Sequence, residues 1–228
     1  MNAPSSTNKI LSGKVTFVSA LQPANMPLAI RFMPLPKVDD VLSVNDTWWH
    51  KLIEQQEMRL LVNDSYSGTT VCTQVRDGQP LSSSFAHRVN HSFCGDDGQQ
   101  PDYIFLFGCT NDSWLDREIG QVQFQNWDID DLKRVLPAYC YVLDQLSATY
   151  RNSRIVTVIN TDLHSEISEG MMLASDHYGT IAVKLHDIDK QHGHPSALGM
   201  KQIAEQVCEA LEQTLKNRPP VPVSFIPN

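Results

Sequence analysis

The chain has 228 residues, of which 41% are hydrophobic and 19% charged, a composition typical of a globular protein that can bury a substantial core. Its formal net charge is -8 and no cluster of lysine and arginine offsets it, which argues against a nucleic-acid partner because like charges repel. No stretch approaches the roughly 18 consecutive apolar residues that a membrane-spanning helix requires, so we expect no membrane partner.

The N-terminal residues and the cysteines bear on the cellular compartment. Residues 1–9 are polar and lack the apolar segment of a secretory signal. The cysteines are odd in number and lack CxxC spacing, which argues against a disulfide framework or a zinc site. They are Cys72, Cys94, Cys109, Cys140 and Cys208. We therefore expect a cytoplasmic protein, with a secreted protein whose signal has been removed as the alternative.

The first part of the chain alternates short apolar runs with one helical segment. Strands are predicted at 15–18 and 59–62, where β-branched and other apolar residues gather. The proline-rich segment 23–36 is predicted as a surface loop, because proline fixes φ and removes a hydrogen-bond donor. Asp46 is expected to cap a helix that runs through Gln56, with its carboxylate accepting from the free amides of the first turn.

The second part carries three further strands and three helices. The strands are predicted at 103–107, 155–159 and 181–185. Helices are predicted at 130–150, with a bend at Pro137, at 165–177, and after Ser196, which is expected to cap the last helix. The last helix has an apolar stripe at helical spacing, which we expect to be buried: Ile203, Val207, Leu211 and Leu215.

Five short strands alternating with helices predict a three-layer α/β/α sandwich, in which helices cover both faces of a mainly parallel five-stranded sheet. We expect a single domain over 1–228, with extended tails at 1–14 and 218–228. In such sheets ligands bind at the carboxyl ends of the strands. The residues that follow each predicted strand are therefore the candidates for a functional site.

Three of these strand ends carry polar segments that contain glycine, asparagine or histidine. After the second strand the chain reads Asn-Asp-Ser-Tyr-Ser-Gly-Thr-Thr over 63–70, and after the third it reads Gly-Cys-Thr-Asn-Asp over 108–112. After the fifth, the segment 186–196 ends in His-Pro-Ser and is followed by Gly199 and the last helix. Because the carboxyl ends of parallel strands share one edge of the sheet, we expect these segments to meet around a single cavity.

In order and position, the three segments resemble the second, third and fifth sequence blocks of the SGNH (GDSL-type) hydrolases, in a bacterial branch similar to carbohydrate esterases. The resemblance extends from about Trp48 onward and implies a flavodoxin-like sandwich. It also implies that the Gly68 amide and the Asn111 carboxamide donate hydrogen bonds to a substrate oxyanion. His194, which precedes Pro195, is implied to be the general base.

The family's nucleophile lies in a Gly-Asp-Ser motif directly after the first strand, and this chain lacks that motif. Ser19 is the only hydroxyl at this strand end and is the candidate nucleophile. Two alternatives stay open. Ser65 is the nucleophile if residues 63–65 are a variant of the motif, or the nucleophile has been lost. The spacing of Ser65 favours a turn residue beside Gly68 instead.

The carboxylate that would orient His194 is not at the family's usual position, because Gln191 stands three residues before the histidine. Asp189 is the nearest carboxylate, with Asp187 behind it, and either would stabilise the charged imidazole. His192 lies three residues after Asp189 and is the alternative base, although no proline follows it. These side chains could also bind a divalent metal, but no second ligand cluster accompanies them and no metal is expected.

The resemblance implies an ester hydrolase that acts on a small acyl ester, with an O-acylated sugar as the candidate substrate and without a cofactor. The competing hypothesis is a non-catalytic relative that binds an ester or carbohydrate in the same pocket. A flavodoxin-like nucleotide binder would share the sheet topology, but no glycine-rich phosphate loop follows the first strand.

Overall fold

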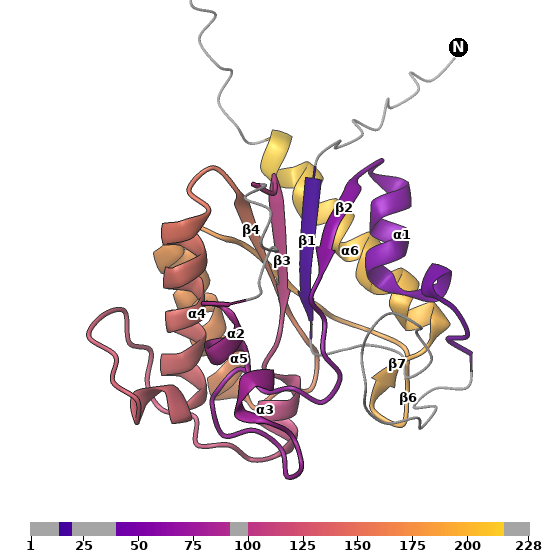
Figure 1. Ribbon diagram of the computed structural model, residues 1–228. Coiled ribbons are helices and arrows are strands. Elements are labelled where there is room, and N and C mark those ends of the chain that lie inside the picture. The colour runs from indigo at the N-terminus through magenta and orange to yellow at the C-terminus, as the bar shows by residue number, and fades with distance from the viewer. Residues whose placement is uncertain (1–13, 20–39, 92–99, 217–228) are drawn as a thin grey trace, which may run out of the picture.

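The computed structural model describes the backbone of residues 14–19, and backbone and side chains over 40–91 and 100–216, the side chain of residue 215 excepted. Within these ranges five strands form one parallel sheet in the order β2-β1-β3-β4-β5 (Figure 1). The strands are β1 (Lys14–Ser19), β2 (Arg59–Asn63), β3 (Tyr103–Phe107), β4 (Arg154–Ile159) and β5 (Ile181–Lys184). The prediction of a parallel five-stranded sheet is confirmed, and each predicted strand agrees with the structure to within one residue at either end.

The helices and a small hairpin complete the described fold. The helices are α1 (Trp48–Gln55), α2 (Phe85–Arg88), α3 (Thr110–Trp114), α4 (Val135–Thr149), α5 (Ser165–Tyr178) and α6 (Ala197–Lys216). Two short antiparallel strands, β6 (Lys190–Gln191) and β7 (His194–Pro195), form a hairpin between β5 and α6. Figure 1 shows α3 and this hairpin at the same end of the sheet, where the parallel strands have their carboxyl ends.

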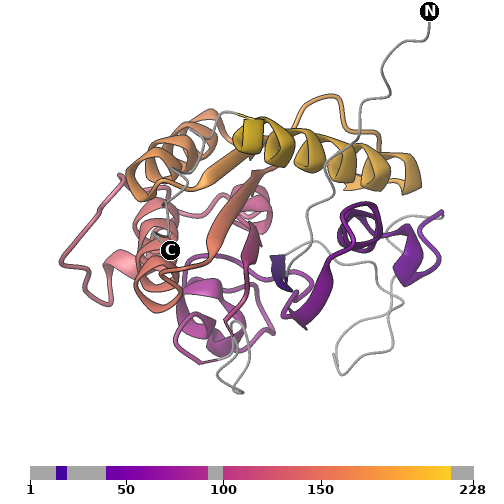
Figure 2. The same cartoon turned by 90° about the horizontal axis from the view of Figure 1, so that it is seen from above.

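Side chains of β3 alternate between two cores, one on each face of the sheet. Phe105 packs in one core with Trp48 of α1 and Ile203 of α6. Ile104 packs in the other core, with residues of α4 such as Leu143. Figures 1 and 2 show α1 and α6 on one side of the sheet and α4 and α5 on the other. Because both faces are covered, all five residues of β3 are buried, which explains its continuous apolar sequence.

Two local predictions are wrong. Asp46 does not cap α1, because it ends a short 3-10 helix (Val44–Asp46) and its Oδ2 accepts from the preceding amide of Ser43 at 2.9 Å. Thr47 precedes α1, without a side-chain hydrogen bond to that helix. Pro137 was expected to bend a helix that begins at 130, but α4 begins at Val135. Pro137 therefore lies in the first turn, where amides have no acceptor within the helix and proline is tolerated.

The start of α6 agrees with the prediction that Ser196 caps this helix. Ser196 Oγ accepts a hydrogen bond from the Gly199 amide at 3.1 Å, as expected of a capping serine. The apolar stripe of α6 is buried at Ile203, Val207 and Leu211, whereas the side chain at 215 lies outside the described part.

Several expectations concern residues outside the described part or bear on the compartment. The predicted loop at 23–36 and the tails before 14 and from 218 lie outside the described residues, whereas position 14 already belongs to β1.

Among the described cysteines, all are buried and none forms a disulfide: Cys72, Cys109, Cys140 and Cys208. Within the ranges that the structure describes, no helix combines the length and apolar character needed to cross a bilayer.

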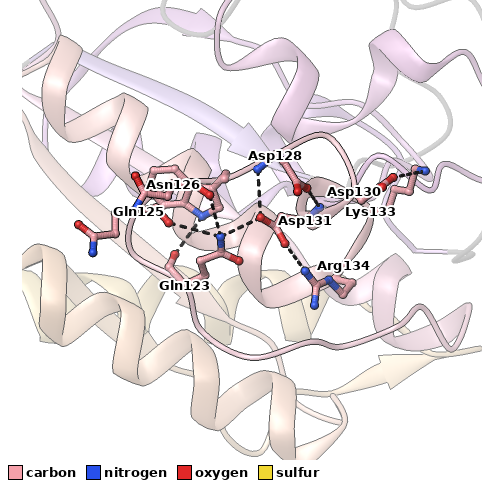
Figure 3. Close-up of polar contacts among 9 residues, drawn as sticks. Gln123, Gln125, Asn126, Asp128, Asp130, Asp131, Lys133 and Arg134 are labelled. Carbon is pink, nitrogen blue, oxygen red and sulfur yellow. Dashed lines mark hydrogen bonds and ion pairs between the residues drawn. The ribbon is translucent and has the colours of Figure 1, made fainter.

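The segment between α3 and α4 is organised around the carboxylate of Asp131. Its Oδ2 accepts hydrogen bonds from Gln123 Nε2 at 2.8 Å and from the Asp128 amide at 3.0 Å (Figure 3). Its Oδ1 forms an ion pair with Arg134. The hydrogen bonds from Asp128 and Gln123 lower the pKa of Asp131, and Arg134 adds to this effect. These contacts shape a long connection that contains only one short 3-10 helix (Asp131–Lys133).

Candidate functional site

The carboxyl ends of β1, β2 and β3 lie side by side. Ser19 is the last residue of β1 and pairs with Phe107, the last residue of β3. Two residues earlier in β1, Phe17 pairs with Asn63, the last residue of β2. The register therefore places the candidate nucleophile next to the segments that carry the predicted oxyanion donors. The side chain of Ser19 lies outside the described part of the chain.

The loop after β2 presents Gly68 in a left-handed conformation with φ of +77°. The backbone conformation favours glycine, and a Cβ at this position would lie 2.8 Å from Gln79 Nε2, so that side chain would have to move. Among the described residues, the Gly68 amide donates no hydrogen bond. Ser65 in the same loop is buried, and its hydroxyl donates to Asn63 Oδ1 at 2.5 Å. The loop thus holds one open backbone donor and a serine that is engaged in the turn.

Asn111 is brought against this loop by α3. Its Nδ2 donates to the carbonyl oxygen of Thr69 at 2.8 Å, and the residue is only 6% exposed. The carboxamide has two N–H groups, and the second has no acceptor among the described residues. The structure therefore places the Asn111 carboxamide beside the residue that follows Gly68.

Asp112, to which the sequence analysis assigned no role, binds two backbone amides that follow the same loop. Its fully buried carboxylate accepts from the Val71 amide at 2.9 and 3.0 Å and from the Cys72 amide at 3.0 Å. Burial raises the pKa of Asp112, although the two amides favour its charged form. The adjacency of Asn111 and Asp112 in the motif is the one signal from which this role could have been predicted.

Arg88 is a second residue that the sequence did not single out. Its guanidinium is buried, donates to the Asp64 carbonyl oxygen at 2.6 Å and forms an ion pair with the Asp64 carboxylate at 2.8 Å. Nε also donates to the Ser83 carbonyl oxygen at 3.0 Å, and Thr69 Oγ1 donates to that same oxygen. Arg88 thus connects α2 to the loop of Gly68. Burial lowers the pKa of Arg88, with Asp64 opposing this shift.

His194 lies against the helix that carries Asn111. Its ring contacts Trp114, the last residue of α3, edge to face, with the centroids 5.1 Å apart. His194 is partly buried, whereas His192 is exposed in the turn of the hairpin, with φ of +50°. The chain therefore brings Gly68, Asn111 and His194 to one end of the sheet through contacts that all involve α3 or its neighbouring loop.

The two candidate orienting carboxylates contact other groups. Asp189 accepts from Ser196 Oγ, and its carbonyl oxygen accepts from the Ser196 amide at 3.1 Å. Asp187 is exposed and pairs with His186 Nδ1 at 3.1 Å. Over the described ranges, no group of three or more His, Cys, Asp or Glu side chains is arranged to hold a metal ion. Asp189 is therefore bound to Ser196, the capping residue of α6, which lies two positions after His194.

Comparisons with known proteins bear on the family of the chain. Residues 11–211 match the model of the GDSL-like lipase/acylhydrolase family. No curated protein matches the chain.

Solved structures give the same result. A protein described as a GDSL-like lipase from Bacteroides uniformis is 36% identical with a TM-score of 0.78, covering 89% of this chain and 96% of that one. Another described in the same way, from Bacteroides ovatus, is 32% identical with a TM-score of 0.74, covering 88% and 98%. A family two carbohydrate esterase from Clostridium thermocellum shares the fold at 14% identity and a TM-score of 0.61, covering 91% and 65%.

Proposed function

Because this chain belongs to the GDSL-like lipase/acylhydrolase family, we propose that it is a serine ester hydrolase that acts on a small acyl ester, with an O-acylated sugar as the candidate substrate. The observation that carries the proposal is the pairing of two donors. The open amide of Gly68 lies one residue from Thr69, whose carbonyl oxygen is bound by the Asn111 carboxamide. Two such donors at one strand edge suit the oxyanion of acyl transfer.

The proposed reaction uses residues of this site alone. The Ser19 hydroxyl attacks the acyl carbon while His194 takes its proton. The oxygen of the tetrahedral intermediate accepts hydrogen bonds from Gly68 and Asn111, and the alcohol leaves with the proton from His194. Water then attacks the acyl-serine and gives up a proton to His194. His194 passes that proton to the departing Ser19 oxygen, and the acid is released. In this proposal Asp189 positions His194 by holding Ser196.

The candidate substrate follows from the surroundings of His194. Trp114 is 42% exposed beside the imidazole, so an indole surface is open to solvent next to the proposed base. Aromatic faces of this kind pack against the apolar faces of sugar rings. The likeness to a carbohydrate esterase at the level of fold is consistent with an acylated sugar.

The first test compares two histidines of the same hairpin. His194→Gln is expected to lower p-nitrophenyl acetate hydrolysis by about 10²–10⁴-fold, because it removes the general base. His192→Gln is the matched control, since this exposed residue lies two positions away, and it should leave the rate within about twofold of the unmodified protein. A larger loss in His192→Gln than in His194→Gln would reverse the assignment of the base.

A second candidate function follows from the absence of Gly-Asp-Ser before Ala20. If the nucleophile has been lost, the same pocket would bind an acylated carbohydrate without cleaving it. The unmodified protein would then show no ester hydrolysis, while calorimetry would still detect binding of an acetylated oligosaccharide. Binding in that case should weaken in Asn111→Ala, which removes a pocket donor.

A further inference from the structure

A cavity lies at the other end of the sheet from the site described above. It has a volume of about 330 Å³ and is lined by eleven residues around the amino ends of β4 and β5. The end of α4 contributes Ser147 and Tyr150, the turn between α5 and β5 contributes Gly179 and Thr180, and α6 contributes Thr214. Its volume is at the lower end of the range for small-molecule sites, which is roughly 300–1,000 Å³.

Two arginines give this cavity its charge. Arg151 and Arg154 both line it, and neither forms an ion pair with a described residue. Arg151 donates through Nε to the Ala148 carbonyl oxygen at 3.3 Å, and Arg154 donates through one terminal nitrogen to Tyr103 Oη at 3.5 Å. Each guanidinium carries five N–H donors, so several remain open on both side chains.

The remaining lining contains no acid. None of the eleven residues is Asp or Glu, although the whole chain has a formal net charge of -8. Hydroxyl groups are frequent instead, on Ser147, Ser153, Thr180 and Thr214. The hydroxyls of Ser153 and Thr214 already donate to backbone carbonyl oxygens, so they offer a ligand their lone pairs as acceptors. Although the protein is acidic, this cavity is lined by two arginines and several hydroxyl groups, and by no carboxylate.

The ends of two helices oppose this positive charge only weakly. α4 and α5 end beside the cavity, and a helix C-terminus carries about half a negative charge. Some of the last carbonyl groups already have donors: Ser175 O accepts from the Thr180 amide at 3.0 Å, Asp176 O from the Gly179 amide at 3.3 Å, and Leu146 O from the Tyr150 amide at 2.9 Å. Two full guanidinium charges therefore outweigh the helix ends.

We propose that this cavity binds a phosphorylated sugar or polyol. Guanidinium groups bind phosphate oxygens with paired, charge-assisted hydrogen bonds, and the hydroxyls suit a polyhydroxylated body. The volume of 330 Å³ has room for such a body in addition to the phosphate. The site is distinct from the proposed ester-hydrolase site, because it lies at the amino ends of the strands and shares none of its residues.

Titration calorimetry on the full-length protein with glucose 6-phosphate tests the proposal. Glucose 6-phosphate should bind measurably and glucose should not, because the phosphate supplies the contact with the arginines. Arg151→Gln and Arg154→Gln should each weaken binding by about tenfold or more, as expected for loss of a charge-assisted hydrogen bond. Arg76→Gln, at an exposed arginine away from the cavity, is the matched control and should bind as the unmodified protein does.

Two further measurements use only the unmodified protein, so they test the proposal even if a variant fails to fold. In the unmodified protein, glucose 6-phosphate should shift the amide NMR signals of Gly179 and Thr180. Glucuronate, which carries a carboxylate in place of the phosphate, should bind at least tenfold more weakly, and equal binding would overturn the assignment of a phosphate ligand. Absence of both heat and amide shifts with glucose 6-phosphate would overturn the site itself.

Discussion

At the scale of single residues, the two left-handed glycines of the segment after β2 differ in their surroundings. Gly68 has φ of +77° and would place a Cβ 2.8 Å from Gln79 Nε2. Gly78 has nearly the same φ of +80°, but a Cβ there would meet nothing within 4 Å. The two positions therefore separate the cost of the backbone conformation from the cost of crowding.

Alanine substitutions at these glycines give the first prediction. Gly78→Ala should lower the free energy of unfolding by roughly 1–2 kcal/mol, the cost of a left-handed conformation for a residue with a Cβ. Gly68→Ala should lose about 1 kcal/mol more, because Gln79 must give up its 3.1 Å hydrogen bond to the Ser67 carbonyl oxygen. Urea denaturation measures both values. Equal losses in the two variants would show that crowding at Gly68 has no energetic effect.

Some residues at the candidate site could be predicted from the sequence and others could not. The roles predicted for Gly68 and Asn111 come from a motif that states the residue types, and the structure places the two residues in adjacent segments. The buried Asp112 and Arg88 received no role, because their contacts span 41 and 24 positions along the chain and no local pattern marks such partners. Asp189 was expected to contact His194, and its bond to Ser196 depends on a hairpin geometry that spacing does not define.

At the scale of secondary-structure elements, the strands were the best predicted part. β3 is apolar at every position because both of its faces are buried, and that pattern is visible in sequence. Helix starts were predicted less well. A carboxylate such as Asp46 can bond amides that precede it or amides that follow it, and residue type alone does not distinguish the two.

The capping serine of α6 gives the second prediction. Ser196→Ala should lower the free energy of unfolding by about 1 kcal/mol, because the Gly199 amide loses its acceptor. Ser165→Ala is the matched control, since this exposed serine at the start of α5 bonds Glu166 and no helix amide, and its effect should stay within about 0.5 kcal/mol. Thermal or urea unfolding distinguishes the two, and an equal effect would contradict the capping role.

The third prediction concerns Asp131, which organises the connection between α3 and α4. Its pKa is lowered in the folded state, so its stabilising contribution is complete above the pKa of the unfolded chain and is lost as the pH falls through the lower, folded value. Asp131→Asn should therefore lower the unfolding midpoint at pH 7 and make the decline toward acidic pH shallower. Asp130→Asn, which removes only the exposed pair with Lys133, is the control.

For Asp131, the outcome is judged from unfolding midpoints measured between pH 3 and pH 7. A variant whose midpoint follows that of the unmodified protein at every pH would show that this carboxylate does not hold the connection. The arrangement itself was not predictable, because Gln123, Asp128 and Arg134 converge through an irregular backbone rather than a repeating pattern (Figure 3).

At the scale of the whole molecule, the order of strands follows from rules that sequence can supply. Strands alternating with helices require right-handed crossovers, which produce a parallel sheet between two helical layers. The same rules bring strand ends together, which is why segments near 68, 111 and 194 lie at one edge (Figure 1). They do not define which hydroxyl would reach the imidazole, because strand order says nothing of where a serine side chain points.

The most direct test of the proposed ester hydrolase is labelling of the full-length protein with a fluorophosphonate, followed by peptide mapping by mass spectrometry. This reagent forms a stable bond with a serine hydroxyl that a neighbouring base activates. The account predicts a single adduct on Ser19 that disappears in His194→Gln. An adduct on Ser65, or no adduct together with no hydrolysis of p-nitrophenyl acetate, would contradict it.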